Sequence, residues 1–178
     1  MSSRHAHAGR TIDKETKRWM GSLPHIATFT MSGAHRAVAH SGVTQTDKFI
    51  FPATPDEDLR RELKLSGTGG VIAKHSEIRH SRQVDSQLWH NAGATGIPTN
   101  DGTPRLWYSV VTLSSDSINI EIQALAFNWR SAMAKIRAAG LPLACADALE
   151  TGLWPSDKFL PSDDRAQRER PLAESVLQ

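Results

Sequence analysis

Apolar and polar positions alternate along residues 118–123, and this period-two pattern predicts a strand of a β-hairpin at 105–126. Isoleucine stands at positions 118, 120 and 122, and polar residues stand between them. Side chains of a strand point alternately to its two faces, so one face of this segment is apolar and the other polar. The Ser-Ser-Asp-Ser run at 114–117 supplies the turn. Shorter strands are predicted at 25–31, at 47–51, and from Gly70 into a stretch rich in histidine.

The clearest helix signal is the sequence TPDEDLRREL at 54–63. Thr54 is the expected N-cap, Pro55 suits the first helical position, and Glu57 completes a capping box. Acidic residues crowd the first turn and basic residues follow, an order that the helix dipole favours. Further helices are predicted at 13–20, 129–139 and 144–151.

These elements predict an α+β fold. A chain of 178 residues fits one domain, and we place a single compact domain at 1–154. Its sheet is expected to be small and mostly antiparallel, built on the hairpin at about 105–126 and packed by several short helices. Residues 1–12 are predicted to form a flexible N-terminal arm, and 155–178 a polar, proline-containing C-terminal tail.

Composition excludes several classes of protein. The longest apolar runs fall far short of the roughly 20 residues that a membrane-spanning helix needs. The first 20 residues contain no apolar segment of the kind found in secretory signals, and a single cysteine, Cys145, cannot form an internal disulfide. We therefore expect a cytoplasmic protein without membrane contact. The glycine-rich run GTGG at 67–70 leads into a strand rather than a helix, and no cofactor is predicted.

The formal net charge is +2, but positive charge is concentrated near the N-terminus and at 74–82. Such local excess favours anionic partners. The second concentration lies within the sequence GGVIAKHSEIRHSRQVDSQLWH at 69–90, which contains three histidines. It also echoes an earlier segment, because AHRAVAHS at 34–41 and KHSEIRHS at 74–81 share the pattern His-x-x-Val/Ile-x-His-Ser.

The spacing of these histidines argues against a metal site defined by a local motif. His75 and His80 stand five positions apart, which directs them to opposite faces of a strand and about 140° apart on a helix. Helical zinc sites need a spacing of four, and zinc deaminases need a Cys-x-x-Cys pair that a single cysteine cannot supply. No metal ligands are predicted.

If 71–80 forms one strand, His75, Glu77 and Arg79 lie on the same face. The imidazole or the carboxylate could then move protons, and the guanidinium could stabilise a charged phosphodiester transition state. The same region can instead bind a polyanion or be ordinary solvated surface. The residues predicted to bind are Lys74, His75, Arg79, His80, Arg82 and Arg105.

Three functions follow from these patterns. The first is a non-enzymatic binding protein whose basic, histidine-rich strip docks on nucleic acid or on an acidic protein or nucleoprotein surface. The second is a metal-independent phosphodiesterase or nuclease that uses His75, Glu77 and Arg79, with His35 or His40 as further candidates. The third is a structural subunit of a larger assembly.

Overall fold

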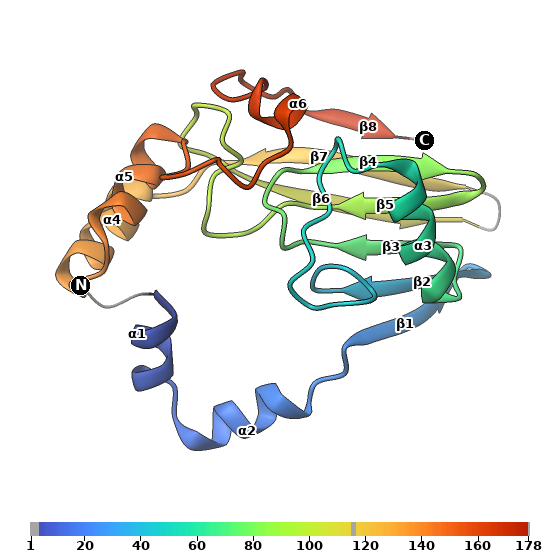
Figure 1. Cartoon of the computed structure of the whole chain (residues 1–178), viewed down its shortest axis with the longest axis horizontal. Helices are drawn as coiled ribbons and strands as arrows, with labels where there is room; N and C mark the ends of the chain where they lie inside the picture. Colours follow the sequence, from blue (N-terminus) through green and yellow to red (C-terminus); the bar gives the residue numbers. More distant parts are fainter. Residues whose placement is uncertain (1–3, 115–116, 178) are drawn as a thin grey trace.

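A computed structural model of the chain describes residues 4–114 and 117–177. Its larger sheet has five strands in the order β1-β2-β3-β5-β4 (Figure 1). These strands are β1 (Ile26–Met31), β2 (Ala34–Ala39), β3 (Gly70–Ala73), β4 (His80–Val84) and β5 (Gln87–Asn91). The pairs β1/β2 and β4/β5 are antiparallel, whereas β2/β3 and β3/β5 are parallel. The sheet is therefore mixed.

The second sheet is antiparallel and contains the predicted hairpin. It consists of β6 (Leu106–Leu113), β7 (Ile118–Leu125) and β8 (Ser175–Leu177), in that order. Opposite each other in β6 and β7 lie Val111 and Ile120, the latter fully buried. The period-two alternation thus identified the hairpin correctly, and the α+β class is confirmed. Two residues of the predicted turn, 115 and 116, lie outside the described residues, as do 1–3 of the predicted arm.

Six helices are found in the described part of the chain, and none is long and apolar enough to cross a membrane. They are α1 (Arg4–Thr11), α2 (Lys14–Ser22), α3 (Asp56–Ser66), α4 (Trp129–Ala138), α5 (Leu143–Thr151) and α6 (Ser162–Arg165).

The predicted capping of α3 by Thr54 is wrong. Pro55 occupies the N-cap position, and the Thr54 hydroxyl instead accepts a hydrogen bond from the Phe51 N–H at 2.8 Å, closing the turn before the helix.

The main core lies between α3 and the five-stranded sheet. Leu59 and Leu63 of α3 are fully buried against a cluster that includes Val71 and Trp89. A second apolar cluster joins the two sheets, where Leu88 of β5 packs with Trp107 and with the isoleucines of β7. Both faces of the central strands are therefore covered, which explains why β3 and β5 contain continuous rather than alternating buried residues.

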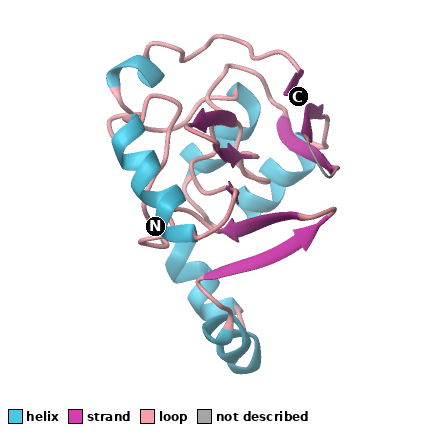
Figure 2. Ribbon diagram, turned by 90° about the vertical axis from the view of Figure 1, so that its right-hand side faces the viewer, coloured by secondary structure: helices cyan, strands magenta, loops and turns pink. Residues whose placement is uncertain are grey.

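Much of the chain between the strands is irregular (Figure 2). Strands β2, β3 and β5 all point toward the side of the molecule that carries α4 and α5 (Figure 1). The loops at 40–55, 74–79 and 92–105 follow these three strands directly. Ligands of open sheets with parallel strands commonly bind outside the carboxyl ends of those strands. The fold thus directs attention to these loops.

The buried carboxylate of Glu62 holds the loop that follows β2. This side chain of α3 accepts hydrogen bonds from the Thr44 N–H at 2.9 Å and from the Thr44 hydroxyl and the Lys48 Nζ, both at 2.6 Å. Burial by itself would raise the pKa of Glu62, but the hydrogen bonds from Lys48 and Thr44 outweigh it and the pKa is lowered. The ionised form therefore stabilises the folded state.

We predict that Glu62→Gln lowers the free energy of unfolding by about 2 kcal/mol at neutral pH, because hydrogen bonds to a charged group are lost. Since folding lowers the Glu62 pKa, this stabilisation is present above the ordinary glutamate pKa and disappears as the pH falls through the folded value. Urea unfolding at several pH values measures both effects. Glu57→Gln, on the exposed first turn of α3, is the matched control and should cost less than about 1 kcal/mol, the usual size of an exposed charge–dipole interaction. Equal losses in the two variants would contradict the prediction.

Candidate functional site

Two histidines meet at the carboxyl ends of the parallel strands β2 and β3. His40 directly follows β2, and His75 stands two residues beyond β3. The Lys74 N–H donates a hydrogen bond to the His40 carbonyl at 3.3 Å, which extends the strand pairing into the loops. As a result, the two imidazole rings lie with their centroids 4.7 Å apart and their planes inclined by 56°.

An aromatic ring covers one side of this pair. Phe49 stacks on His75 with a centroid distance of 4.6 Å and an interplanar angle of 27°. The loops that carry these rings are tied together below them, because the buried Ser76 hydroxyl accepts a hydrogen bond from the Ile50 N–H at 3.0 Å. Ser76 therefore fixes His75 and Phe49 relative to each other, and it explains why the predicted strand at 47–51 is a loop instead.

The surroundings of His75 favour its neutral form. Burial contributes most to lowering its pKa, and the nearby charges of His40 and Lys74 act in the same direction, while Asp47 opposes them. A neutral imidazole has a lone pair on one ring nitrogen and can accept a proton or bind a metal ion. The pair thus offers nitrogen donors at the edge of the sheet.

The predicted alignment of His75, Glu77 and Arg79 on one strand face is wrong. Strand β3 ends at Ala73, and both His75 and Glu77 adopt left-handed backbone conformations, with φ values of 35° and 51°. Such a turn removes the alternation on which the prediction depended. Arg79 points elsewhere, because its guanidinium lies 4.0 Å from the centre of the Trp107 ring and donates a hydrogen bond to the Ala173 carbonyl.

The remaining residues of the predicted binding set are scattered. Arg105 joins Arg79 on the Trp107 ring, at 4.8 Å from its centre, and pairs with Asp101. Arg82 is bound to the Asp56 carboxylate and to two backbone carbonyls. His80 is buried and Lys74 is exposed. As ligand contacts these residues stay predictions, but the fold does not gather them on one exposed strip.

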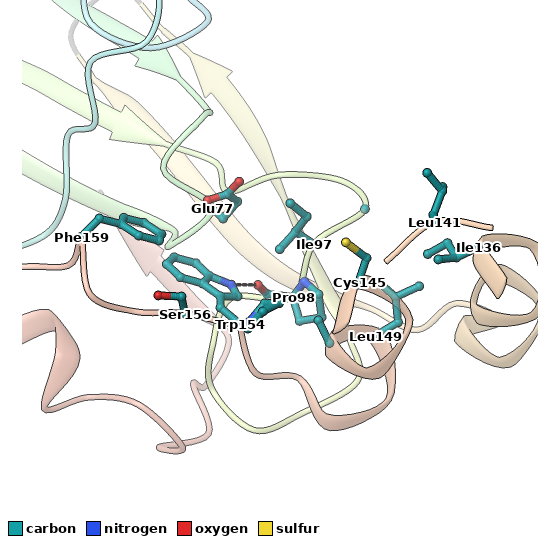
Figure 3. A pocket seen from close by; sticks show the side chains of 13 residues that line it. Glu77, Ile97, Pro98, Ile136, Leu141, Cys145, Leu149, Trp154, Ser156 and Phe159 are labelled. Carbon is teal, nitrogen blue, oxygen red and sulfur yellow. Dashed lines mark hydrogen bonds between the residues drawn. The ribbon is translucent and has the colours of Figure 1, made fainter. Parts of the chain in front are cut away.

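Next to the histidine pair lies a cavity of about 360 Å³. It opens between the α4–α5 hairpin and the loop that follows β5, and most of its lining is apolar (Figure 3). Its floor is Trp154, whose Nε1 donates a hydrogen bond to the Pro98 carbonyl at 2.6 Å and whose ring stacks on Phe159 at 5.6 Å. The carboxylate of Glu77 lies on the side of the cavity nearest the sheet (Figure 3).

Sequence reasoning identified His75 and Glu77 and named His40 as a further candidate, but it missed Phe49 and the meeting of the two imidazoles. The contacts of His75 with His40 and Phe49 depend on strand pairing and on a loop, and neither is visible as local spacing. The echo between 34–41 and 74–81 was the one available signal. It aligns His40 with His80, however, whereas the fold places His40 beside His75.

The chemistry of the donors suits a divalent metal ion, but only in part. Neutral imidazoles are good ligands for zinc and similar ions, and catalytic zinc sites use three protein ligands and an open position. Within residues 4–114 and 117–177, no group of three or more histidine, cysteine or acidic side chains is arranged to hold a metal. His40 and His75 can therefore supply part of a coordination shell and not all of it.

The sequence matches no family model and no curated protein, but the fold has clear structural neighbours. The hypothetical protein PH1004 from Pyrococcus horikoshii OT3 aligns with a TM-score of 0.66 and 11% identity, over 79% of this chain and 55% of that one. A metallophosphoesterase from Sphaerobacter thermophilus aligns with a TM-score of 0.64 and 17% identity, over 81% of this chain and 64% of that one. The chain shares their fold and spans between half and two thirds of their length.

These findings correct the function predicted from the sequence. Docking of a basic strip on nucleic acid or on an acidic protein surface is wrong, because the fold is shared with a metallophosphoesterase and the strip does not form. The metal-independent phosphodiesterase is also wrong, because Arg79 is stacked on Trp107 rather than placed beside His75. No finding bears on the structural-subunit alternative, which stays a prediction.

Proposed function

We propose that this chain is a metal-dependent phosphoesterase component that binds phosphoesters beside His40 and His75. The observation that carries the proposal is the meeting of these two imidazoles at the ends of parallel strands, 4.7 Å apart, in a fold shared with a metallophosphoesterase. Its cytoplasmic location stays a prediction from the sequence.

His40 and His75 are the residues that would hold the ion. A divalent cation at this position would polarise a phosphoryl oxygen as a Lewis acid. The coordination shell needs further ligands, which water or substrate oxygens would provide. The chain itself keeps His75 neutral through burial, and Phe49 shields one face of the ring from solvent.

The test is a calorimetric titration of Zn²⁺ into the wild-type chain and into His40→Ala and His75→Ala. We expect one bound ion in the wild type and a loss of affinity of at least about 10-fold in each variant, because each removes a ligand from an already incomplete shell. His35→Ala is the matched control, since His35 is exposed and lies at the opposite end of β2. Unchanged affinity in the two pair variants, or an equal loss in the control, would overturn the proposal.

A further inference from the structure

We infer that the cavity beside the histidine pair receives the organic part of the substrate, and that this part is an uncharged apolar or aromatic alcohol. The inference rests on the proposed function and narrows it to a class of phosphoester. The phosphoryl group would lie at His40 and His75, and the esterified alcohol would extend into the cavity between Trp154 and the α4–α5 hairpin.

The two parts of this site are contiguous. Phe49, which stacks on His75, lies with its ring centroid 5.4 Å from that of Phe159, and Phe159 stacks in turn on Trp154. The backbone makes a second connection, because Glu77 lines the cavity only two residues after His75. A row of touching rings thus joins His75 to the cavity, and a ligand that occupied both places would lie along that row.

The size and lining of the cavity define the chemistry of its ligand. A volume of about 360 Å³ lies near the lower end of the usual range for small-molecule sites, roughly 300–1,000 Å³. Aliphatic side chains line the wall opposite Trp154, among them Ile97, Leu141 and Leu149 (Figure 3). Burial of an apolar group against such a surface is favourable in proportion to the area removed from water.

The mostly apolar lining of the cavity disfavours a second anionic group on the ligand. Glu77 is the one charged side chain among the described residues that line it. A carboxylate or second phosphate on the alcohol would have to give up water against the apolar side chains that make up most of the lining, which is unfavourable. The site should therefore discriminate between phosphoesters by the charge of their organic part.

Phosphonates test the inference without being hydrolysed, because a carbon atom replaces the bridging ester oxygen. We would titrate methylphosphonate, 1-naphthylmethylphosphonate and 4-carboxybenzylphosphonate, whose two acid groups are too far apart to share one metal ion, into the wild-type chain with saturating Zn²⁺. The naphthylmethyl compound should bind at least about 10-fold more tightly than methylphosphonate, and the carboxybenzyl compound should bind more weakly than the naphthylmethyl compound. Equal affinities for the first two would overturn the inference, and this comparison needs no variant.

Variants locate the effect in the cavity. The sulfur of Cys145 points toward Ile97 (Figure 3), so a phenylalanine at this position fills the space between them. Cys145→Phe should therefore remove the tighter binding that the naphthyl group provides, and it should leave the affinity for methylphosphonate unchanged. Ala144→Phe adds the same side chain at the neighbouring exposed position and should change neither affinity. If 1-naphthylmethylphosphonate still binds more tightly than methylphosphonate in Cys145→Phe, the naphthyl group does not lie in the cavity.

Failure of the proposed function has a separate signature. If His40→Ala and His75→Ala bind methylphosphonate as tightly as the wild type does, the phosphoryl group does not bind at the histidine pair and the proposed function is wrong. The inference then fails with it, even if 1-naphthol alone occupies the cavity. If methylphosphonate depends on both histidines but the naphthyl group adds nothing, the proposed function stands and only the inference is wrong.

Discussion

Acidification from about pH 7 to about pH 4 should lower the free energy of unfolding by several kcal/mol, because two buried histidines must then take up protons. His90 is fully buried and His80 is 8% exposed. The Nδ1 of His80 lies 3.0 Å from the Ile78 carbonyl oxygen, and the Nδ1 of His90 lies 2.8 Å from the Ser81 hydroxyl. In the described part of the chain, the Nε2 atoms of both rings are buried without a hydrogen-bond partner.

Burial lowers the pKa of both groups to about 4, and in His90 the nearby His80 contributes as well. The unfolded chain, with a histidine pKa near 6.5, therefore binds more protons than the folded chain between about pH 4 and pH 6.5. Stability is complete above that window and is lost as the pH falls through it. A shift of this size corresponds to an upper limit of about 3 kcal/mol for each histidine.

Urea unfolding at intervals of pH measures this loss. His90→Gln, which cannot take up a proton, should reduce the slope of stability against pH below about pH 6.5. His35→Gln, an exposed histidine of β2, should leave that slope unchanged. A stability that stays flat from about pH 7 to about pH 4.5 would contradict the buried neutral state of these rings.

Replacement of Gly152 by alanine should cost about 3 kcal/mol of unfolding free energy, the sum of a conformational and a steric penalty. Gly152 ends α5 with a φ of 71°, a left-handed conformation that disfavours any residue with a Cβ. A Cβ at this position would collide with the backbone nitrogen and carbonyl oxygen of Thr103. Flexible side chains could move aside, but these backbone atoms cannot.

Gly140→Ala separates the two penalties. Gly140 also has a positive φ, 65°, but a Cβ there would meet no atom within 4 Å. Its replacement should cost about 1 kcal/mol, the conformational part alone. Thermal and urea unfolding of both variants give the comparison, and equal losses would show that α5 does not approach Thr103 as described. Because α5 forms one wall of the cavity, Gly152→Ala should also weaken the binding of ligands that enter the cavity.

The sequence predicted those elements whose stabilising contacts are local. The isoleucines of β7 alternate because that strand has one buried face, and the acidic first turn of α3 reflects the dipole of the helix itself. The parallel pairing of β2 with β3 was not predictable in this way. Its partners are separated by a loop and a helix, and short segments such as GVIA at 70–73 carry no signal for what lies beside them.

The candidate site was only half visible for the same reason. His75 stood out among charged neighbours, but its ring contacts come from His40 and Phe49 on another loop. The predicted row of side chains required an unbroken strand to 80, and the left-handed conformations of His75 and Glu77 end that row. Local alternation can place residues on a shared face only while the regular backbone continues.

The central claim is that a metal ion and a phosphoryl group bind together at His40 and His75. The most direct measurement is the affinity of the wild-type chain for Zn²⁺ with and without saturating methylphosphonate, and the reverse titration. Because phosphoryl oxygens would complete an unfinished coordination shell, each ligand should strengthen the binding of the other by the same factor, at least about 5-fold. Affinities that are independent of each other, or a coupling that survives His75→Ala, would contradict the account.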